Sequence, residues 1–531
     1  HFLINQDSSF IYNTTINGSQ PSNPDSGSVV IFESGEDTIS ILCGFTITGG
    51  TGFLQTFNYP LRVGGGIVFI NSGGKVIKNI IKENTCVLDT LNGMVMGGGI
   101  GSGPPDSQNH VIIRENTINA NLAWTKKSSE AWTVGWAQGG AIFLCYDGEI
   151  ENNHIQDNIC KSDSTLSLGG AIRLWNNVNK INVKIHYNEI QGNQSIAIAD
   201  QSFAGGISCS GANTNIQHNT IAQNITSGGT YCLGTGMYFD LVDTFDVKLI
   251  NNKIIGNYSL EGASSGGGIG FYRSNIVECS NNLFTGNEAD NGGAIAFENS
   301  TPNTISNNTI ISNSATQFGG AIYLKNTSSV IVENSILREN TANGEPNEVE
   351  VENGSTFSIN YSNIEGSWNG TGNIDNDPLF KMSGEHPYQL MSNSPCIDTA
   401  TPDTAGLNLP EFDMAGSVRI FNSRLDIGAY EWNLPTSVAN YLGDSKELTI
   451  DCFPNPFHNN ITIEYDLEKS VNVYINIFNQ YGQQIDSIII GESQTGKQQI
   501  IWNASSHPDG IYFIVFRTGE IIQSRKIIKV T

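Results

Sequence analysis

Short apolar segments separated by turn residues run through most of the chain, and their spacing repeats. The six-residue pattern Asn-x-apolar-x-x-Asn occurs eight times, at intervals of 26 to 37 residues. The copies begin at Asn79, Asn116, Asn153, Asn188, Asn219, Asn252, Asn282 and Asn308, and each ends on the asparagine five residues later. No stretch keeps the 3.6-residue period of an amphipathic helix. The pattern therefore predicts a solenoid of short strands.

A second motif, Gly-Gly-Ala-Ile or a relative of it, lies between successive copies of the first. Its copies end on Ile67, Ile100, Ile142, Ile172, Ile207, Met237, Ile269, Ile295 and Ile322. The residue two positions later is apolar or a thiol in eight of the nine copies, as an inward-facing strand position requires. We expect three of these residues, Phe239, Phe271 and Phe297, to stack as an aromatic column.

Each interval holds two short β segments and two turns, which is the unit of a parallel β-helix. Coils stacked about 4.8 Å apart bring identical residues into ladders. Asparagine suits a turn ladder because it tolerates the left-handed backbone and its amide bonds in both directions. Gly-Gly suits a corner where a Cβ would collide with the next coil. The predicted fold class is all-β: a right-handed parallel β-helix of about 11–12 coils, followed by a small antiparallel β-sandwich.

The repeats of residues 28–364 resemble the β-helix repeats of bacterial surface proteins, most closely those of the polymorphic-outer-membrane-protein type. The later motifs Asp377-Pro378-Leu379-Phe380, Ser394-Pro395-Cys396-Ile397-Asp398 and Asp426-Ile427-Gly428-Ala429-Tyr430-Glu431 are similar to the cap of "choice-of-anchor" secreted proteins. That resemblance implies a segment that covers the open end of the solenoid, which otherwise exposes a sheet edge.

The last part of the chain has a different character, with longer alternating strands. The landmarks Phe453-Pro454-Asn455-Pro456-Phe457, Gly510-Ile511-Tyr512-Phe513 and Lys526-Ile527-Ile528-Lys529-Val530 resemble the C-terminal sorting domain of the type IX secretion system of Bacteroidetes-like bacteria. The resemblance implies recognition by the outer-membrane secretion machinery, export across the outer membrane, and attachment to the cell surface or release. We therefore expect a β-helix over 1–375, its cap over 376–434, a linker over 435–447 and the sorting domain over 448–531.

Composition narrows the function classes. The net charge of −25 argues against nucleic acid, because phosphate binding needs clustered Lys and Arg. No apolar run reaches the ~18 residues of a transmembrane span. The nine cysteines show no metal or disulfide spacing, and most are expected to be small buried residues. The eight histidines form no recurring column, so neither a metal nor a cofactor is predicted.

Irregular spacers point to a candidate binding surface. The spacer after the second Asn is longest in the N-terminal coils, and residues 122–138 should form a wall beside the strand that follows. The predicted ligand-binding residues on this wall and strand face are Trp124, Trp132, Trp136, Phe143, Trp175, Tyr238 and Tyr272. Aromatic planes flanked by a few polar groups are how proteins hold sugar rings. The competing interpretation is that the tryptophans pack under their own loops.

Catalysis on the same face has three candidate residues, Asp240, Glu298 and Arg173. The two carboxylates should lie two coils apart, about 9.6 Å by strand spacing, near the upper limit for an inverting glycosidase. No catalytic motif of a known family includes these residues. The favoured hypothesis is a non-catalytic adhesion, matrix or glycan-binding protein of the cell surface. A polysaccharide lyase or glycoside hydrolase, and a structural subunit of an extracellular filament or layer, are the alternatives.

Overall fold

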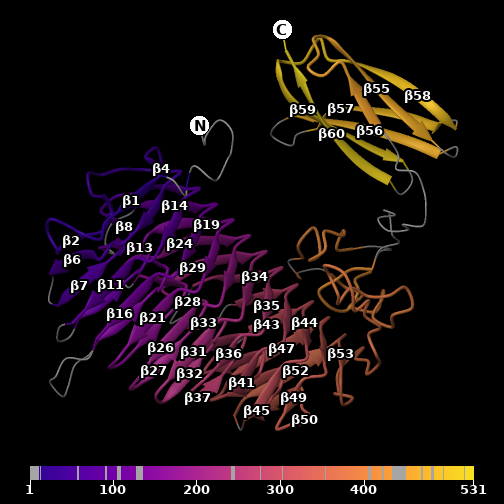
Figure 1. Cartoon of the computed structure of the whole chain (residues 1–531). Helices are drawn as coiled ribbons and strands as arrows, with labels where there is room; N and C mark the ends of the chain where they lie inside the picture. The colour runs from indigo at the N-terminus through magenta and orange to yellow at the C-terminus, as the bar shows by residue number, and fades with distance from the viewer. Residues whose placement is uncertain are drawn as a thin grey trace. The chain divides into compact units, whose positions relative to one another are not determined.

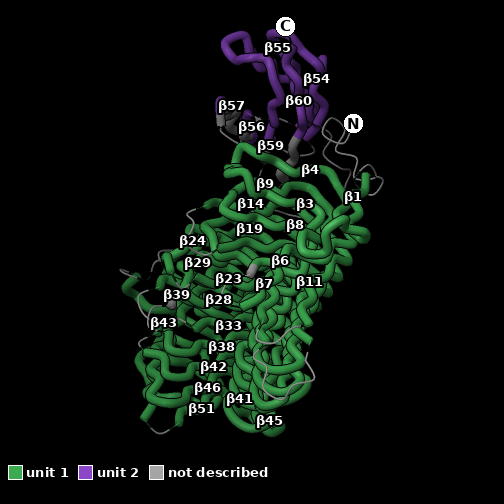
Figure 2. Tube along the Cα trace, turned by 90° about the vertical axis from the view of Figure 1, so that its left-hand side faces the viewer, with its two compact units in different colours: residues 1–432 green, residues 433–531 purple. Residues whose placement is uncertain are grey.

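The structure is a computed structural model that describes residue 11 and residues 14–530, apart from 57–58, 90–92, 105–108, 127–134, 177, 241–244, 275–276, 302, 353, 405–406, 408, 421–423, 433–449, 468–470, 480–483, 494 and 519–520. The chain divides into two compact units, residues 1–432 and 433–531, which are coloured separately in Figure 2. Each unit is described by itself.

The first unit is a parallel β-helix, and successive coils follow one another from the indigo to the orange end of the chain (Figure 1). Each coil contributes strands, in chain order, to sheets A, B, C and D. Sheets A, C and D contain 12, 11 and 11 described strands in strictly parallel order, which confirms the predicted fold class. Stacked parallel coils thus account for the repeats seen in the sequence.

The strands of the three parallel sheets are short and regularly spaced. Sheet A comprises β1 (Thr15–Asn17), β5 (Thr46–Thr48), β10 (Ile80–Lys82), β15 (Thr117–Asn119), β20 (His154–Gln156), β25 (Glu189–Gln191), β30 (Thr220–Ala222), β35 (Lys253–Ile255), β40 (Leu283–Thr285), β44 (Thr309–Ile311), β48 (Ile336–Arg338) and β53 (Asn363–Ile364). Sheet C comprises β3 (Val30–Phe32), β8 (Ile67–Ile70), β13 (Ile100–Gly103), β18 (Ile142–Leu144), β23 (Ile172–Trp175), β28 (Ile207–Ser210), β33 (Met237–Asp240), β38 (Ile269–Tyr272), β42 (Ile295–Glu298), β46 (Ile322–Lys325) and β51 (Val349–Val351). Sheet D comprises β4 (Ile41–Cys43), β9 (Gly74–Ile77), β14 (His110–Arg114), β19 (Asp147–Glu151), β24 (Ile181–His186), β29 (Ala212–Gln217), β34 (Val247–Ile250), β39 (Val277–Ser280), β43 (Asn303–Ser306), β47 (Ser329–Glu333) and β52 (Thr356–Asn360).

Sheet B differs because most coils contribute two strands to it. Its strands are β2 (Ser26–Gly27), β6 (Gly52–Thr56), β7 (Pro60–Val63), β11 (Thr85–Leu88), β12 (Met94–Met96), β16 (Leu122–Thr125), β17 (Trp136–Gln138), β21 (Ile159–Ser162), β22 (Ser167–Leu168), β26 (Gln194–Ala197), β27 (Gln201–Phe203), β31 (Ile225–Gly228), β32 (Tyr231–Leu233), β36 (Tyr258–Ser259), β37 (Ala263–Ser265), β41 (Glu288–Asn291), β45 (Ser314–Phe318), β49 (Thr341–Ala342) and β50 (Glu345–Pro346). The strands β11, β16, β21, β26, β31 and β36 form one parallel ladder, and β12, β17, β22, β27, β32 and β37 form a second. We call this pair of ladders the flange.

Small side chains hold the two ladders of the flange together. Cys86, Ala123 and Cys160 on the first ladder pack against Val95 and Ala137 on the second. Farther along, serine hydroxyls of the second ladder donate to carbonyls of the first, as from Ser167 Oγ to Cys160 O at 2.8 Å. The long spacers noted in the sequence are therefore ordered, paired strands, with only their tips outside the described residues.

The interior of the β-helix follows the period-2 pattern of the sequence. Phe239, Phe271 and Phe297 stack with ring centroids 5.4 and 4.9 Å apart, which confirms the predicted column. The asparagines that start and end the six-residue motif form two continuous ladders, each amide nitrogen donating to the next Oδ1 at about 3 Å (Asn116 to Asn153, 3.0 Å). The nine cysteines are free thiols, and seven are buried, as expected.

The turns differ from the prediction in one respect. The left-handed residue is not the ladder asparagine but the residue before it, for example Lys78 at φ 55° and Glu83 at φ 55°. The asparagine itself therefore does not adopt the left-handed conformation. Its side-chain amide donates a hydrogen bond to the backbone carbonyl two residues earlier in the turn. The glycine corners behave as predicted: a Cβ on Gly140 would lie 2.2 Å from the carbonyl oxygen of Gly170 in the next coil.

The C-terminal segment of this unit does not lie where the sequence placed it. Residues 371–374 pair with the edge of the last coil, through the bridge Asn363↔Ile374. The predicted cap instead packs along the side of the solenoid. Its buried core of Phe380, Leu390, Cys396, Leu425 and Ile427 covers Leu283, Ile311 and Ile336 on the outer face of sheet A. Gly428 makes this possible, because a Cβ there would lie 2.8 Å from Ile336 Cδ1.

The second unit is a small antiparallel sandwich, as predicted. One sheet contains β54 (Ile450–Phe453), β55 (Asn460–Leu467) and β58 (Gly496–Asn503). The other contains β57 (Gln484–Ser493), β56 (Val471–Asn479), β59 (Gly510–Thr518) and β60 (Ile521–Lys529). Alternating apolar residues from both sheets, with Phe457 and Trp502, fill the core between them.

Candidate functional site

The surface predicted from the sequence lies on the outer face of sheet C, and its register is as expected. Asp240 pairs with Tyr272, and Tyr272 with Glu298, so the two carboxylates are two coils apart. Phe143 and Arg173 are likewise neighbours across β18 and β23. The strand positions inferred from the repeat are therefore correct.

Most of this face is not open to solvent, however, because the second ladder of the flange covers it. Phe143 is 1 % exposed and Tyr238 is 5 % exposed. The ring of Tyr238 stacks on Phe203 of the flange, with centroids 4.6 Å apart. The prediction that Phe143 and Tyr238 present aromatic planes to a ligand is wrong. They point away from the coil interior but pack into a second apolar layer. Trp175 and Tyr272 remain partly exposed.

The tryptophans of the flange do not form one wall. In β16, Ala123 faces the partner ladder, so Trp124 points to the opposite side. In β17, Gln138 accepts a hydrogen bond from Arg173 and so faces sheet C. Trp136 is two residues earlier in the same strand and therefore lies on the same face as Gln138. Trp124 and Trp136 thus lie on opposite outer sides of the flange. Trp124 is held by Lys126 and Lys161 against its ring and by its Nε1–H bond to Asp163. The third one, Trp132, lies outside the described residues.

Both candidate catalytic carboxylates have partners. Asp240 accepts a bidentate pair of bonds from Arg273, at 2.7 and 2.8 Å from Nη2 and 3.1 Å from Nε. Glu298 is 6 % exposed and accepts a hydrogen bond from the hydroxyl of Tyr231 on the flange. Asp240 is partly exposed but paired, whereas Glu298 is buried against the flange. The contact of Glu298 with Tyr231 suits packing of the flange better than acid–base chemistry.

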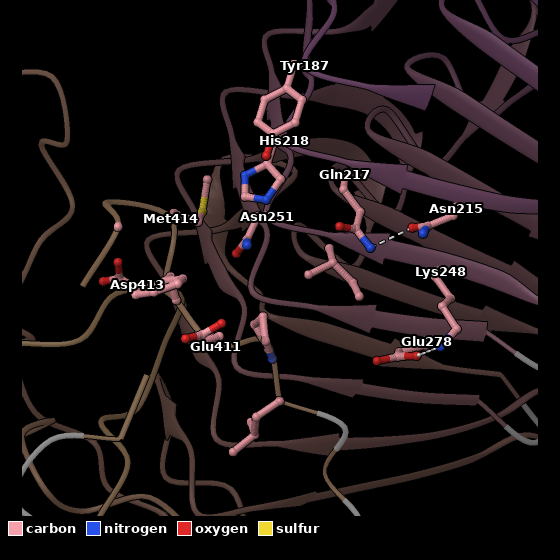
Figure 3. A pocket seen from close by; sticks show the side chains of 15 residues that line it. Tyr187, Asn215, Gln217, His218, Lys248, Asn251, Glu278, Glu411, Asp413 and Met414 are labelled. Atoms are coloured by element: carbon pink, nitrogen blue, oxygen red, sulfur yellow. Dashed lines mark hydrogen bonds and ion pairs between the residues drawn. The ribbon is translucent and has the colours of Figure 1, made fainter. Parts of the chain in front are cut away.

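A more open site lies elsewhere, between sheet D and the side-packed cap. A cleft of about 790 Å³ is bounded on one side by strands and turns of the solenoid and on the other by cap residues 409–416. In Figure 3 the cap residues Glu411 and Met414 face Tyr187, His218 and Asn251 across this space. Its volume is within the range of small-molecule and sugar sites. We call it the sheet D cleft.

An aromatic platform forms one edge of the cleft. Tyr187 and His218 are the left-handed turn residues that precede ladder asparagines of adjacent coils, at φ 57° and 56°. Their rings therefore project outward one above the other, with centroids 4.8 Å apart and planes 8° from parallel. Tyr187 is 57 % exposed. Burial lowers the pKa of His218, and the adjacent His186 lowers it further, so the imidazole is neutral at neutral pH.

Polar side chains of sheet D form the floor. Gln217 Nε2 donates to Asn215 Oδ1 at 2.7 Å, and Lys248 pairs with Glu278 at 3.3 Å. A second hollow of about 320 Å³ continues over sheet D and shares Asn215 and Lys248 with the first. The floor is thus rich in amides, and the lysines of its described lining, Lys248 and Lys184, are each paired with a carboxylate.

The cap wall presents apolar side chains and the carboxylate of Glu411 to the cleft, and it is anchored from behind. Phe412, 44 % exposed, and Met414 line the cleft. Asp413 between them is buried and accepts backbone N–H bonds from Ala415, Ser417 and Glu431 at 2.7 to 2.8 Å. Burial raises the pKa of this carboxyl, while those N–H groups oppose the shift. Asp413 therefore fixes the loop that closes the cleft.

The sheet D cleft was not predicted. Its cap residues are about 190 residues away in sequence from the platform, and nothing in the repeat shows that the cap folds back. The platform itself carries a usable signal, because the residue before each first asparagine occupies one outward column. Tyr187 and His218 are the two aromatic members of that column. The described residues hold no cluster of three or more His, Cys, Asp or Glu suited to a metal ion.

Comparisons with known families agree with these two units. Residues 205–379 match the right-handed β-helix region family, and residues 451–530 match the secretion system C-terminal sorting domain. No curated protein matches the chain. In the part of the chain that the structure describes, no helix is long and apolar enough to cross a bilayer. The protein is a right-handed parallel β-helix with a type IX secretion system C-terminal sorting domain, exported across the outer membrane to the cell surface or the extracellular space.

Proposed function

We propose that the protein is a non-catalytic adhesion or matrix component that binds glycan chains, and that the sheet D cleft is where it binds them. The observation that carries this proposal is the stacked platform of Tyr187 and His218 beside a floor of amides. An exposed ring offers a sugar its apolar face, while amide groups bond to the hydroxyls. Because Lys248 is paired with Glu278, the cleft favours uncharged sugars.

The groups around the cleft support binding better than turnover. Glu278 is in an ion pair, and Asp413 is occupied by three backbone N–H groups. Glu411 is the exposed carboxylate of the described lining. Glycoside hydrolysis ordinarily uses two carboxyl groups that both reach the substrate, and one exposed carboxylate supplies only half of such a pair.

Glycan-array binding and turnover assays on the same neutral polysaccharides test this proposal. The Tyr187→Ala variant should lose most binding, at least tenfold in affinity, because stacking on the platform is removed. Phe318→Ala is the matched control, since Phe318 is also an exposed ring, 48 % exposed, but lies on sheet B. We expect the control to bind normally and no variant to release reducing ends or unsaturated products.

Two results would contradict the proposal. Product release that disappears in a Glu278→Gln or an Asp240→Asn/Glu298→Gln variant would make the protein a polysaccharide-active enzyme. Absence of binding to every glycan tested would leave a structural subunit of an extracellular layer as the better description.

A further inference from the structure

Arg173 is a buried cation whose described hydrogen bonds all go to uncharged groups. It lies on β23 beneath the flange and is 4 % exposed. Its Nε donates to Gln138 Oε1 at 3.3 Å. Its Nη1 donates to Ser208 Oγ at 2.8 Å and Ser210 Oγ at 3.1 Å. These partners orient the guanidinium but do not neutralise it.

Asp240 is a carboxylate that favours the charged form of Arg173, but both of its oxygens already accept hydrogen bonds from Arg273. Within the described residues, none of the ion pairs includes Arg173. Burial disfavours the charged form and lowers the pKa of this guanidinium, yet an arginine keeps its proton in proteins. Arg173, Arg273 and Asp240 together therefore carry one positive charge in excess.

A buried charge without a counterion is costly to keep, and a buried group perturbed in this way is a candidate functional site. Partly exposed groups lie beside Arg173. Trp175 is on the same strand, and its register partner Ser210 is on the next strand, β28. Three strands from β23 on the same face, the side chain of Arg273 is 46 % exposed over the ring of Tyr272. This rim provides a hydroxyl and an aromatic surface next to the buried cation, and a second cation farther along the sheet.

We propose that Arg173 and its rim form a second glycan site, which binds the carboxylate or sulfate group of an acidic sugar. A guanidinium binds both oxyanions through planar, charge-assisted hydrogen bonds. The net charge of −25 repels a uniformly charged polyanion. The ligand is therefore a mainly neutral glycan in which acidic residues are sparse. The site is on sheet C and shares no residue with the sheet D cleft, so the two proposals stand or fall separately.

The test is calorimetric titration of the full chain at constant ionic strength with methyl glucuronide, a sulfated galactoside, methyl glucoside, acetate and sulfate. We expect the two acidic sugars to bind and the neutral glucoside not to bind. Binding by one acidic sugar alone identifies which anion the site selects. Binding of the inorganic ions without either acidic sugar would overturn the assignment to a glycan.

Ser210→Asp is the informative variant. It places a carboxylate against Arg173 Nη1, so the excess charge disappears while the arginine stays in place. The new carboxylate also lies beside Asp240, its register partner, so the attraction to Arg173 is offset by this repulsion. We expect a folded protein with at least a tenfold loss of affinity for the acidic sugars. Ser227→Asp on the first ladder of the flange adds the same charge away from Arg173 and should bind normally. Arg173→Gln should also lose binding.

Equal binding by wild type and a folded Ser210→Asp protein would overturn the proposal, as would absence of binding to any of the anions. The Tyr187→Ala protein serves as the independent reference, because it should retain the anionic sugars even if it loses neutral glycans. A result in which Tyr187→Ala abolishes both would place the anion in the sheet D cleft instead.

Discussion

The side-chain amide of a ladder asparagine forms hydrogen bonds with several coils at once. Asn193 Oδ1 accepts bonds from the backbone N–H and the side-chain amide of Asn158, at 3.0 and 2.9 Å. Its Nδ2 donates to two carbonyls, Ile155 O and Gln191 O, and to Asn224 Oδ1. One buried side chain therefore satisfies groups in three consecutive coils, which explains why the repeat tolerates so little else at this position.

We expect Asn193→Ala to destabilise the β-helix by about 2–4 kcal/mol, because it leaves buried donors of Asn158 and an acceptor of Asn224 without partners. Urea unfolding followed by far-ultraviolet circular dichroism measures the change. Gln156→Ala is the matched control, an amide removed from an exposed position one coil earlier. Similar losses in both variants would show that the ladder bonds contribute little beyond helix-wide packing.

Predictions for single residues were correct where they depend on alternation within one strand. They failed where a segment distant in the sequence covers the residue. The inward column of Phe239, Phe271 and Phe297 follows from alternation within each strand. Phe143 also obeys that alternation and points away from the coil, yet it is buried. The second ladder of the flange covers Phe143. The repeat pattern of the sequence does not predict how the spacer that forms this ladder folds.

The amide-to-amide hydrogen bonds of the second Asn ladder all run in one direction along the β-helix, and the ladder ends at a carboxyl group. Each amide donates toward the next coil, from Asn84 through to Asn340. The last amide donates to Glu348, whose oxygens accept from Asn340 Nδ2 at 2.6 Å and Asn340 N at 3.2 Å. The carboxyl of Glu348 thus accepts the hydrogen bonds from the last asparagine of the ladder that the next asparagine accepts in the earlier coils.

This carboxyl makes the end of the β-helix sensitive to pH. Burial raises the pKa of Glu348 to about 8, although the bonds from Asn340 oppose the shift. The folded protein therefore holds a proton that the unfolded chain releases near pH 4, so its contribution to stability is lost as pH rises toward 8. We expect the melting temperature of the wild type to fall across pH 5 to 8 more steeply than that of Glu348→Gln.

Glu350→Gln, which changes a partly exposed neighbour on β51, is the control for this pH series. It should reproduce the wild-type slope. A Glu348→Gln protein with the wild-type slope would mean that other buried acids set the pH dependence.

Whole-molecule organisation is where sequence and structure differ most. The repeats and the landmarks of the sorting domain predicted both folds, since each is encoded in spacing that repeats or in ordered local motifs. The side-packed cap depends instead on contacts between residues far apart, such as Gly428 against Ile336. Because the sheet D cleft needs that cap as its second wall, the site could not be found from the solenoid pattern alone.

The same dependence gives a test of how the cleft is built. Ile336 is 1 % exposed on β48, and the cap core of Leu425 and Ile427 covers it. Ile336→Glu buries an unpaired carboxylate under the cap, which should release the cap while the inward-facing core of the coils remains intact. We expect faster proteolysis within residues 376–432, retained β-sheet signal, and at least a tenfold loss of neutral glycan binding. Ile331→Glu in the same coil, at a position 39 % exposed on sheet D, should change none of these. Glycan binding that survives cap release would show that Tyr187 and His218 suffice alone and that the cap wall is not part of the site.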